Sequence, residues 1–246
     1  MTAVSDAERL RMRERPDGRP VMRQVWRHLA FLHWRVTIDD LRGLVPRELD
    51  VDLFDGAAYV GIVPFTIPLT RTAMFGLPMA SAFHEINLRT YVHRGGRDPG
   101  VWFFSLDATS RLAVAGARIA YKLPYFAADI TMQVSADAAV DYDSRRRAAP
   151  ANFRTRYRPV GPVAEAAPGS LEFFLAERYL LYAWSGRALR TARVHHVPYP
   201  LQPATADDVA QTLTAAAGLP AHACQGAPPL VHYAQGVDVR IFGPAP

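Results

Sequence analysis

The chain has 246 residues, half of them hydrophobic, with a formal net charge of +5 and a single cysteine, Cys224. It contains no apolar run long enough to span a membrane, its N-terminus is charged where a secretory signal would be apolar, and a lone cysteine excludes a disulfide within the chain. Its positive charge is scattered and almost entirely arginine, without a nucleic-acid-binding motif, so we expect a cytoplasmic protein that binds neither nucleic acid nor membrane.

The N-terminal residues 1–20 are polar and show no apolar period, which predicts a flexible N-terminal tail. Residues 21–246 predict a single domain, because a chain of this length can bury one substantial core. Within it, Thr37 indicates the start of a short helix that ends before Pro46, with two aspartates in its first turn.

An Asp-Gly pair between two apolar runs is the clearest hairpin signal in the chain. It predicts strands over residues 49–54 and 57–65, joined by a type I′ turn at Asp55-Gly56. Prolines interrupt the next segment, residues 66–81, which we expect to form a long loop that acts as a pocket wall or lid.

Residues 83–92 form the most informative predicted strand. Alternation places Glu85, Asn87 and Arg89 on one face, between aromatic rings, and mostly apolar side chains on the other. The pattern alone leaves two interpretations of the polar face: an exposed surface with a cross-strand ion pair, or the inner wall of a ligand-holding barrel. A turn at residues 94–98 then leads into another strand over residues 101–107.

A segment of small residues, 112–121, predicts a helix that Thr109 or Ser110 caps and that Pro124 stops. Its basic face either meets solvent or closes a pocket for an acidic small molecule. Helical spacing gives an apolar face of Leu112, Gly116, Ile119 and Leu123 and a basic face of Arg111, Ala115, Arg118 and Lys122.

The rest of the chain predicts short strands and two further helices. In residues 153–160, arginines alternate with Phe153, Thr155 and Tyr157, as expected for a sheet with one solvated face. The other predicted strands are 129–136, 139–144, 192–197 and one or two strands within 231–242. The predicted helices are 171–182, which Ser170 caps, and 205–217, which Thr205 caps.

The sequence carries no motif for a metal or a cofactor. Its histidines form neither His-x-His nor His-Glu-x-x-His, and the phosphate loop, the dinucleotide fingerprint and Gly-x-Ser-x-Gly are absent, so we expect no metal and no cofactor. Charged residues beside apolar surface remain as candidates, each equally readable as part of a structural ion pair. They are Glu85, Arg89, Asp107, Arg118, Lys122, Glu177 and Arg178.

Eight short motifs, taken together, carry a family resemblance. They are FLHW (31–34), VPREL (45–49), DGAAYVGIVPF (55–65), FHEINLRTYV (83–92), FFSLDA (103–108), ARIAYKLPY (117–125), ERY (177–179) and HHVPYPL (195–201). In them the chain resembles the YqjF-like family of uncharacterised bacterial proteins, which is similar in fold to acetoacetate decarboxylase. The resemblance implies an α+β, mainly antiparallel fold: a closed β-barrel with a few packed helices, whose internal cavity is lined by the Glu85 face.

The same resemblance bears on the chemistry. Acetoacetate decarboxylases form a Schiff base through a lysine of a Pro-Lys-Lys sequence, whose pKa is lowered by its surroundings. The matching segment here is residues 123–126, so Tyr125 stands where the nucleophilic lysine would be, and a phenol cannot form an iminium with a ketone. Lys122, the only lysine in the chain, lies three residues earlier. Schiff-base acetoacetate decarboxylation is therefore not expected.

We accordingly predict a barrel protein that binds a small anionic carbonyl or carboxylate compound, with lyase, hydratase or aldolase-type turnover left open. The alternative is a non-catalytic ligand-binding or assembly module. The candidate catalytic residues are Glu85 as acid or base, Tyr125 as hydrogen-bond donor and Lys122 as a displaced amine. The candidate ligand-binding residues are Arg89, Arg118 and Asn87. The identity of the ligand and assembly into a homo-oligomer are not decided by the sequence.

Overall fold

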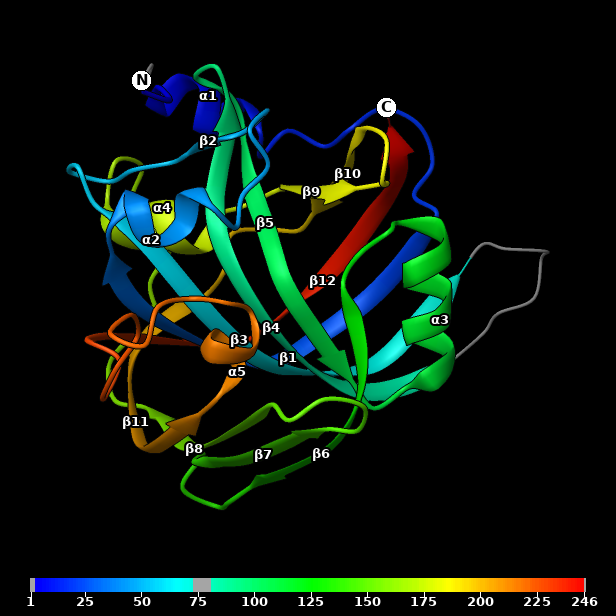
Figure 1. The fold of residues 1–246 in the computed structure, drawn as a ribbon. Coiled ribbons are helices and arrows are strands. Elements are labelled where there is room, and N and C mark those ends of the chain that lie inside the picture. Colours follow the sequence, from blue (N-terminus) through cyan, green and yellow to red (C-terminus); the bar gives the residue numbers. More distant parts are fainter. Residues whose placement is uncertain (1–2, 73–80, 246) are drawn as a thin grey trace.

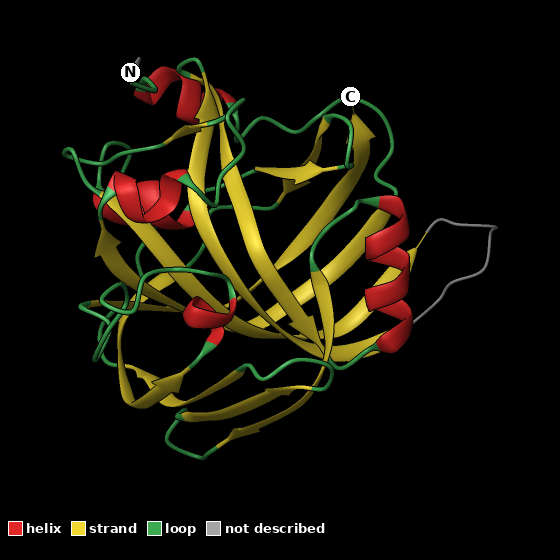
Figure 2. Cartoon of the chain, in the orientation of Figure 1, coloured by secondary structure: helices red, strands yellow, loops and turns green. Residues whose placement is uncertain are grey.

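The computed structural model describes residues 3–72 and 81–245, and its strands curl into a closed barrel with short helices around it (Figures 1 and 2). The helices are α1 (Asp6–Arg11), α2 (Ile38–Arg42), α3 (Arg111–Ala120), α4 (Leu171–Ala176) and α5 (Leu213–Ala216). The strands are β1 (Met22–Val36), β2 (Asp50–Val51), β3 (Ala58–Thr72), β4 (Ser81–Arg94), β5 (Arg97–Ala108), β6 (Tyr125–Val134), β7 (Val140–Arg146), β8 (Asn152–Pro159), β9 (Leu180–Trp184), β10 (Leu189–His195), β11 (Leu201–Gln211) and β12 (Leu230–Ala245). None of the helices in the described ranges is long and apolar enough to cross a membrane.

The strand order closes two circuits that share the strands β12, β1, β3, β4 and β5. One circuit is completed by β9 and β10, and the other by β6, β7, β8 and β11. Within the described residues, the strand pairings are antiparallel except those of β5 with β6 and with β9. This confirms the expected fold class, a mainly antiparallel closed barrel.

The shared strands serve both circuits because alternate side chains point to opposite faces of a sheet. On β1, Leu32 packs into a filled core together with Tyr142 and Phe153 of the β6–β7–β8–β11 side. Leu29, three residues earlier, belongs to a separate cluster inside the circuit that β9 and β10 complete. The circuit that β9 and β10 complete encloses the cavity described below.

Several predicted elements are confirmed. Helix α2 begins after Thr37, whose side chain and that of Asp40 form a capping box. Asp55 and Gly56 both have positive φ angles, 47° and 74°, as a type I′ turn requires. The strands at the β4, β5, β6, β7, β8, β10 and β12 positions are also confirmed, and the arginines of β8 are exposed between buried neighbours as expected.

The hairpin and the loop after it differ from the prediction. Beyond a single bridge from Phe54 to Ala57, β2 pairs with β4 instead of β3. Strand β3 then continues past Pro68 to Thr72. Its pairing with β4 shifts register between Ile67 and Thr70, the stretch that contains Pro68. The loop expected at 66–81 is thus partly strand, and its residues 73–80 lie outside the described ranges.

Two predicted helices are shorter than expected, and the rest of each segment includes strand. The helix expected at 171–182 ends at Ala176, and the chain continues as β9, which pairs with β5 and β10. The helix expected at 205–217 is mostly β11, which pairs with β8 through a bulge at Asp208, where φ is 51°. The pattern of a short segment can suit either a helix or a strand, so pairing with neighbouring strands decides which one forms.

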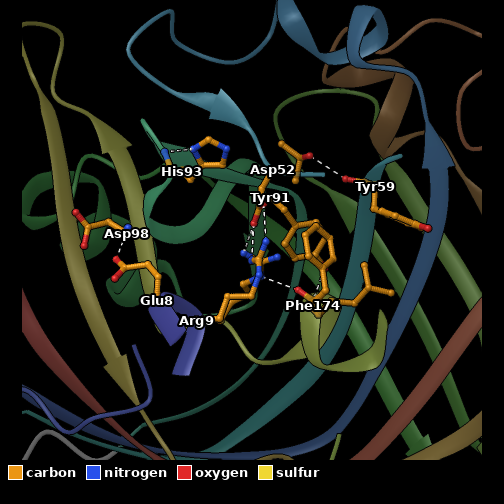
Figure 3. Close-up of polar contacts among 12 residues, drawn as sticks. Glu8, Arg9, Asp52, Tyr59, Tyr91, His93, Asp98 and Phe174 are labelled. Atoms are coloured by element: carbon orange, nitrogen blue, oxygen red, sulfur yellow. Dashed lines mark hydrogen bonds and ion pairs between the residues drawn. The ribbon is translucent and has the colours of Figure 1, made fainter. Parts of the chain in front are cut away.

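The segment expected as a flexible tail contains α1, which is docked on the barrel. Arg9 is buried and donates two hydrogen bonds of 2.7 Å to the carboxylate of Asp52, as Figure 3 shows. Met12, at the end of the helix, is 2% exposed. Composition alone suggested a tail, because a polar segment gives no sign that a distant buried carboxylate will pair with one of its arginines.

Candidate functional site

A cavity of about 530 Å³ lies inside the circuit that β9 and β10 complete, and residues of α3 form part of its wall. Figure 1 shows α3 beside the barrel. Most of its lining is apolar, including Leu29, Phe31, Val63, Phe65, Phe103 and Leu106. Leu112 and Gly116 of α3 line it and are exposed, so the cavity opens to solvent beside that helix. Cavities of this size and character are typical of small-molecule sites.

The polar row on β4 faces into this cavity. Glu85, Asn87 and Arg89 all line it, with exposed fractions of 5%, 6% and 8%. On the opposite face of the same strand, Ile86 and Leu88 enter the filled core. The structure therefore supports the inner-wall interpretation of the polar face over the solvated one.

Glu85 forms a buried pair with Tyr125, the first residue of β6. The Tyr125 hydroxyl donates a hydrogen bond of 2.9 Å to Oε2 of Glu85. Burial raises the pKa of Glu85 to about 8, aided by repulsion from Asp107 and opposed by the hydrogen bond from Tyr125. Glu85 is therefore mostly a neutral carboxylic acid at pH 7, a state in which it can donate a hydrogen bond or a proton.

Two arginines supply positive charge at the other end of the row. Arg89 donates from Nη2 to the carbonyl oxygen of Leu175 at 3.1 Å, while its Nε has no hydrogen-bond partner among the described residues. Arg178 also lines the cavity and donates from Nη1 to Asp52 at 2.7 Å, and its Nη2 likewise lacks a partner in the described part of the chain. Burial lowers the pKa of Arg178 only to about 10, so it remains charged at neutral pH.

The charges around this end do not balance. Arg9 and Arg178 share the single carboxylate of Asp52, and Arg89 is paired only with a carbonyl oxygen. Buried positive charge without a counterion is costly, and an anion in the cavity would relieve it. The electrostatics of the cavity thus favour an anionic ligand.

Two predicted site residues lie outside the cavity. The Lys122 side chain is exposed and borders a separate outer hollow together with Trp102 and Pro124. Arg118 is exposed, and its Nε donates to the backbone oxygen of Tyr125 at 2.6 Å. The structure therefore does not bring either residue to Glu85.

The cause is the rotation of α3 about its axis. Ser110 caps the helix as predicted, but Val114 is its buried residue, while Leu112 and Ile119 are 74% and 73% exposed. Leu112, Gly116 and Leu123 of the expected apolar face line the cavity, whereas all four residues of the expected basic face are exposed. The basic face therefore meets solvent, which is one of the two alternatives that the sequence left open.

Other charged candidates form structural pairs. Asp107 accepts two hydrogen bonds from Arg146, at 3.0 and 2.8 Å, and links β5 to β7. Glu177 accepts hydrogen bonds from the Tyr179 hydroxyl and from the backbone nitrogen of Tyr199. Across the described residues, no three His, Cys, Asp or Glu side chains gather into a group that could hold a metal ion.

Arg178 and Tyr199 also line the cavity. Arg178 was among the charged candidates but was given no ligand-binding role, and Tyr199 was not predicted. Arg178 follows the C-terminal cap of α4, in a short irregular segment that the sequence suggested was helical. Its buried partner Asp52 gave no signal in the sequence, because it alternates with Val51 and Leu53 as a solvent-facing residue would. Tyr199 carried no signal either.

Comparisons with known proteins agree with this architecture. A model of the family DUF2071, described as an uncharacterized conserved protein, matches residues 23–238. The uncharacterized protein YqjF of Bacillus subtilis (strain 168) is 42% identical over 229 residues, which are 92% of this chain and 93% of that protein. These findings confirm the family resemblance seen in the motifs.

Solved structures share the fold at low sequence identity. The enduracididine biosynthesis enzyme MppR, complexed with pyruvate, gives a TM-score of 0.61 at 12% identity and covers 93% of this chain and 91% of that one. Acetoacetate decarboxylase from Legionella pneumophila subsp. pneumophila str. Philadelphia 1 gives 0.61 at 14% identity, with 100% and 96% covered. The barrel is therefore of the acetoacetate decarboxylase-like type.

Proposed function

We infer that this chain, which belongs to the DUF2071 family of uncharacterized conserved proteins, binds a small anionic carbonyl or carboxylate compound in its barrel cavity. The observation that carries the proposal is the convergence of the Glu85, Asn87 and Arg89 row with Tyr125 and Arg178 on that one cavity. In this proposal Arg89 and Arg178 hold the anionic group, and Asn87 contributes a hydrogen bond beside them. The pyruvate bound by MppR, a protein of the same fold, is a ligand of this chemical class.

Glu85 and Tyr125 supply the acid–base part of the proposal. A protonated Glu85 that faces a ligand carbonyl would donate a hydrogen bond to its oxygen, and Tyr125 would orient the acid. Polarising a carbonyl in this way suits lyase, hydratase or aldolase-type chemistry. A non-catalytic binding module would need the arginines but not the acid, so the two versions differ in what they require of Glu85.

The position of Lys122 argues against a Schiff-base mechanism. Its side chain borders the outer hollow, and Tyr125 occupies the position that the resemblance gives to the lysine. We expect borohydride reduction in the presence of pyruvate to leave the mass of the peptide containing Lys122 unchanged. The N-terminal peptide is analysed separately, because the α-amino group is the other amine in the chain. A pyruvate-derived mass increase on Lys122 would contradict this part of the proposal.

Binding itself is tested with 2-oxohexanoate and its neutral methyl ester by isothermal titration calorimetry. The Arg89→Met variant removes the charge but keeps a long apolar side chain, so we expect at least a tenfold loss of affinity for the acid and little change for the ester. Arg154→Met, on the exposed face of β8, is the matched control. If the acid binds Arg89→Met as tightly as the parent, or does not bind the parent, the proposed function is wrong.

A further inference from the structure

We propose that the ligand is a medium-chain carboxylate, with its acid group at Arg89 and Arg178 and its chain running along β4 toward α3, and that Gly116 sets the longest chain accepted. The inference rests on the proposed function, because it takes the arginine end as the carboxylate site. It adds that the part of the ligand beyond the carboxylate is an apolar chain, and that Gly116 determines which chain lengths bind.

The cavity wall is the first argument. Apart from the β4 row, Arg178 and a few hydroxyl and amide groups, the lining is mainly aliphatic and aromatic, and it includes Phe31, Val63, Val101 and Phe103. A three-carbon acid held at the arginines would leave most of this wall in contact with water. Each methylene that the ligand buries there strengthens binding about fourfold, so the wall favours a long apolar body.

The spacing of the polar groups is the second argument. Glu85 and Arg89 pair with Phe65 and Gly61 on β3, so the strand between them is extended. Four residues of extended strand span roughly 13 Å between Cα atoms, which matches an extended chain of roughly ten carbons. A medium-chain acid held at the arginines therefore lies along the whole row and reaches the Glu85–Tyr125 pair.

Gly116 is the third argument, because it lies at the open end of this path. It lines the cavity from an exposed position on α3, and a Cβ built on it would meet no other atom within 4 Å. A larger side chain at residue 116 would therefore extend into the mouth of the cavity without clashing with the protein. Glycine is also a weak helix former, so replacing it within α3 does not disfavour the helix.

The test measures affinity by calorimetry for butanoate, hexanoate, octanoate, decanoate and dodecanoate, below their micelle concentrations. For the parent protein we expect affinity to rise about fourfold per methylene and to level off near decanoate. Gly116→Leu should weaken decanoate binding at least tenfold, leave butanoate within twofold and shift the optimum to a shorter acid. Ala115→Leu is the matched control, because Ala115 is an exposed neighbour on α3 that does not line the cavity.

The outcomes separate this inference from the proposed function. Equal affinity for butanoate and decanoate, with binding still dependent on Arg89, would overturn the medium-chain ligand and leave the carboxylate site intact. Affinity that rises with chain length in parallel in Gly116→Leu and in the parent would overturn the role of Gly116. Decanol binding as tightly as decanoate, in both the parent and Arg89→Met, would instead contradict the carboxylate site itself.

Discussion

Glu85 links the chemistry of the cavity to the stability of the protein. Its pKa is about 8 in the folded chain against an ordinary value of 4.5, so folding is coupled to proton uptake at this residue. The contribution of neutral Glu85 to the free energy of unfolding is fully present below about pH 4.5. It is lost as the pH rises through the folded-state pKa near 8.

We therefore expect the free energy of unfolding of the parent to fall relative to Glu85→Gln between pH 5 and pH 8. The slope should be at most about 1.4 kcal/mol per pH unit, because one group titrates. Urea unfolding at each pH unit measures it, and Glu48→Gln, at an exposed position, is the control. Parallel pH profiles for the parent and Glu85→Gln would show that Glu85 does not have the raised pKa.

The individual site residues differ in how far the sequence could predict them. The row of Glu85, Asn87 and Arg89 follows from the two-residue period of a strand, which holds wherever the strand is placed. The placement of Arg118 and Lys122 depends on how α3 is rotated against the barrel, and local spacing does not determine that rotation. Arg178 lies in an irregular segment, and its place at the cavity depends on its distant partner Asp52, which local spacing does not report.

At the scale of elements, α1 shows how a polar segment becomes part of the fold. Arg9 is paired with Asp52, and its guanidinium lies 4.9 Å from the centre of the Phe174 ring (Figure 3). The same carboxylate binds Arg178 on the cavity side. Docking of α1 is therefore coupled to the position of an arginine that lines the cavity.

Replacing Arg9 tests this coupling. We expect Arg9→Met to lower the free energy of unfolding by roughly 2–3 kcal/mol, less than for a buried charge left alone, because Arg178 still pairs with Asp52. Arg11→Met, which removes exposed pairs with Glu8 and with Asp98 of β5, should cost at most about 1 kcal/mol. Urea unfolding compares the two, and equal losses would mean that the buried pair does not hold α1.

The elements that the sequence misassigned share a physical cause. Residues 205–217 contain alanines, threonines and acidic residues that suit a capped helix, yet β11 forms there because Ala204 and Ala206 pack against the filled core beside β8. Small residues fit either structure, so tertiary pairing outweighs local propensity. At Asp55-Gly56 the sequence signal was a backbone requirement, namely two residues that tolerate positive φ angles, and the predicted turn is confirmed.

For the whole molecule, the shared strands explain why the barrel holds both a filled core and a cavity. Alternate residues of β1 face opposite sides, and both sides are largely apolar. The apolar pattern shows that both faces are buried but not which one is packed solid. That difference depends on the volumes of side chains contributed by distant strands, such as Tyr142 and Phe153, and no local pattern reports it.

Two leucines on β1 allow the two sides to be compared with the same substitution. Leu32 is in the filled core and Leu29 lines the cavity, and they are 0% and 1% exposed. Leu32→Ala opens a new void, so we expect a loss of about 3–5 kcal/mol in the free energy of unfolding. Leu29→Ala enlarges an existing cavity and removes fewer packing contacts, so its loss should be smaller by about 1 kcal/mol or more.

Urea unfolding gives both losses, and carboxylate affinity supplies the second readout. Leu29→Ala should weaken decanoate binding because it removes part of the wall, whereas Leu32→Ala should leave it unchanged in the folded protein. Equal losses of stability with equal effects on binding would mean that the two faces of β1 are packed alike. The division into one filled circuit and one hollow circuit would then not hold in solution.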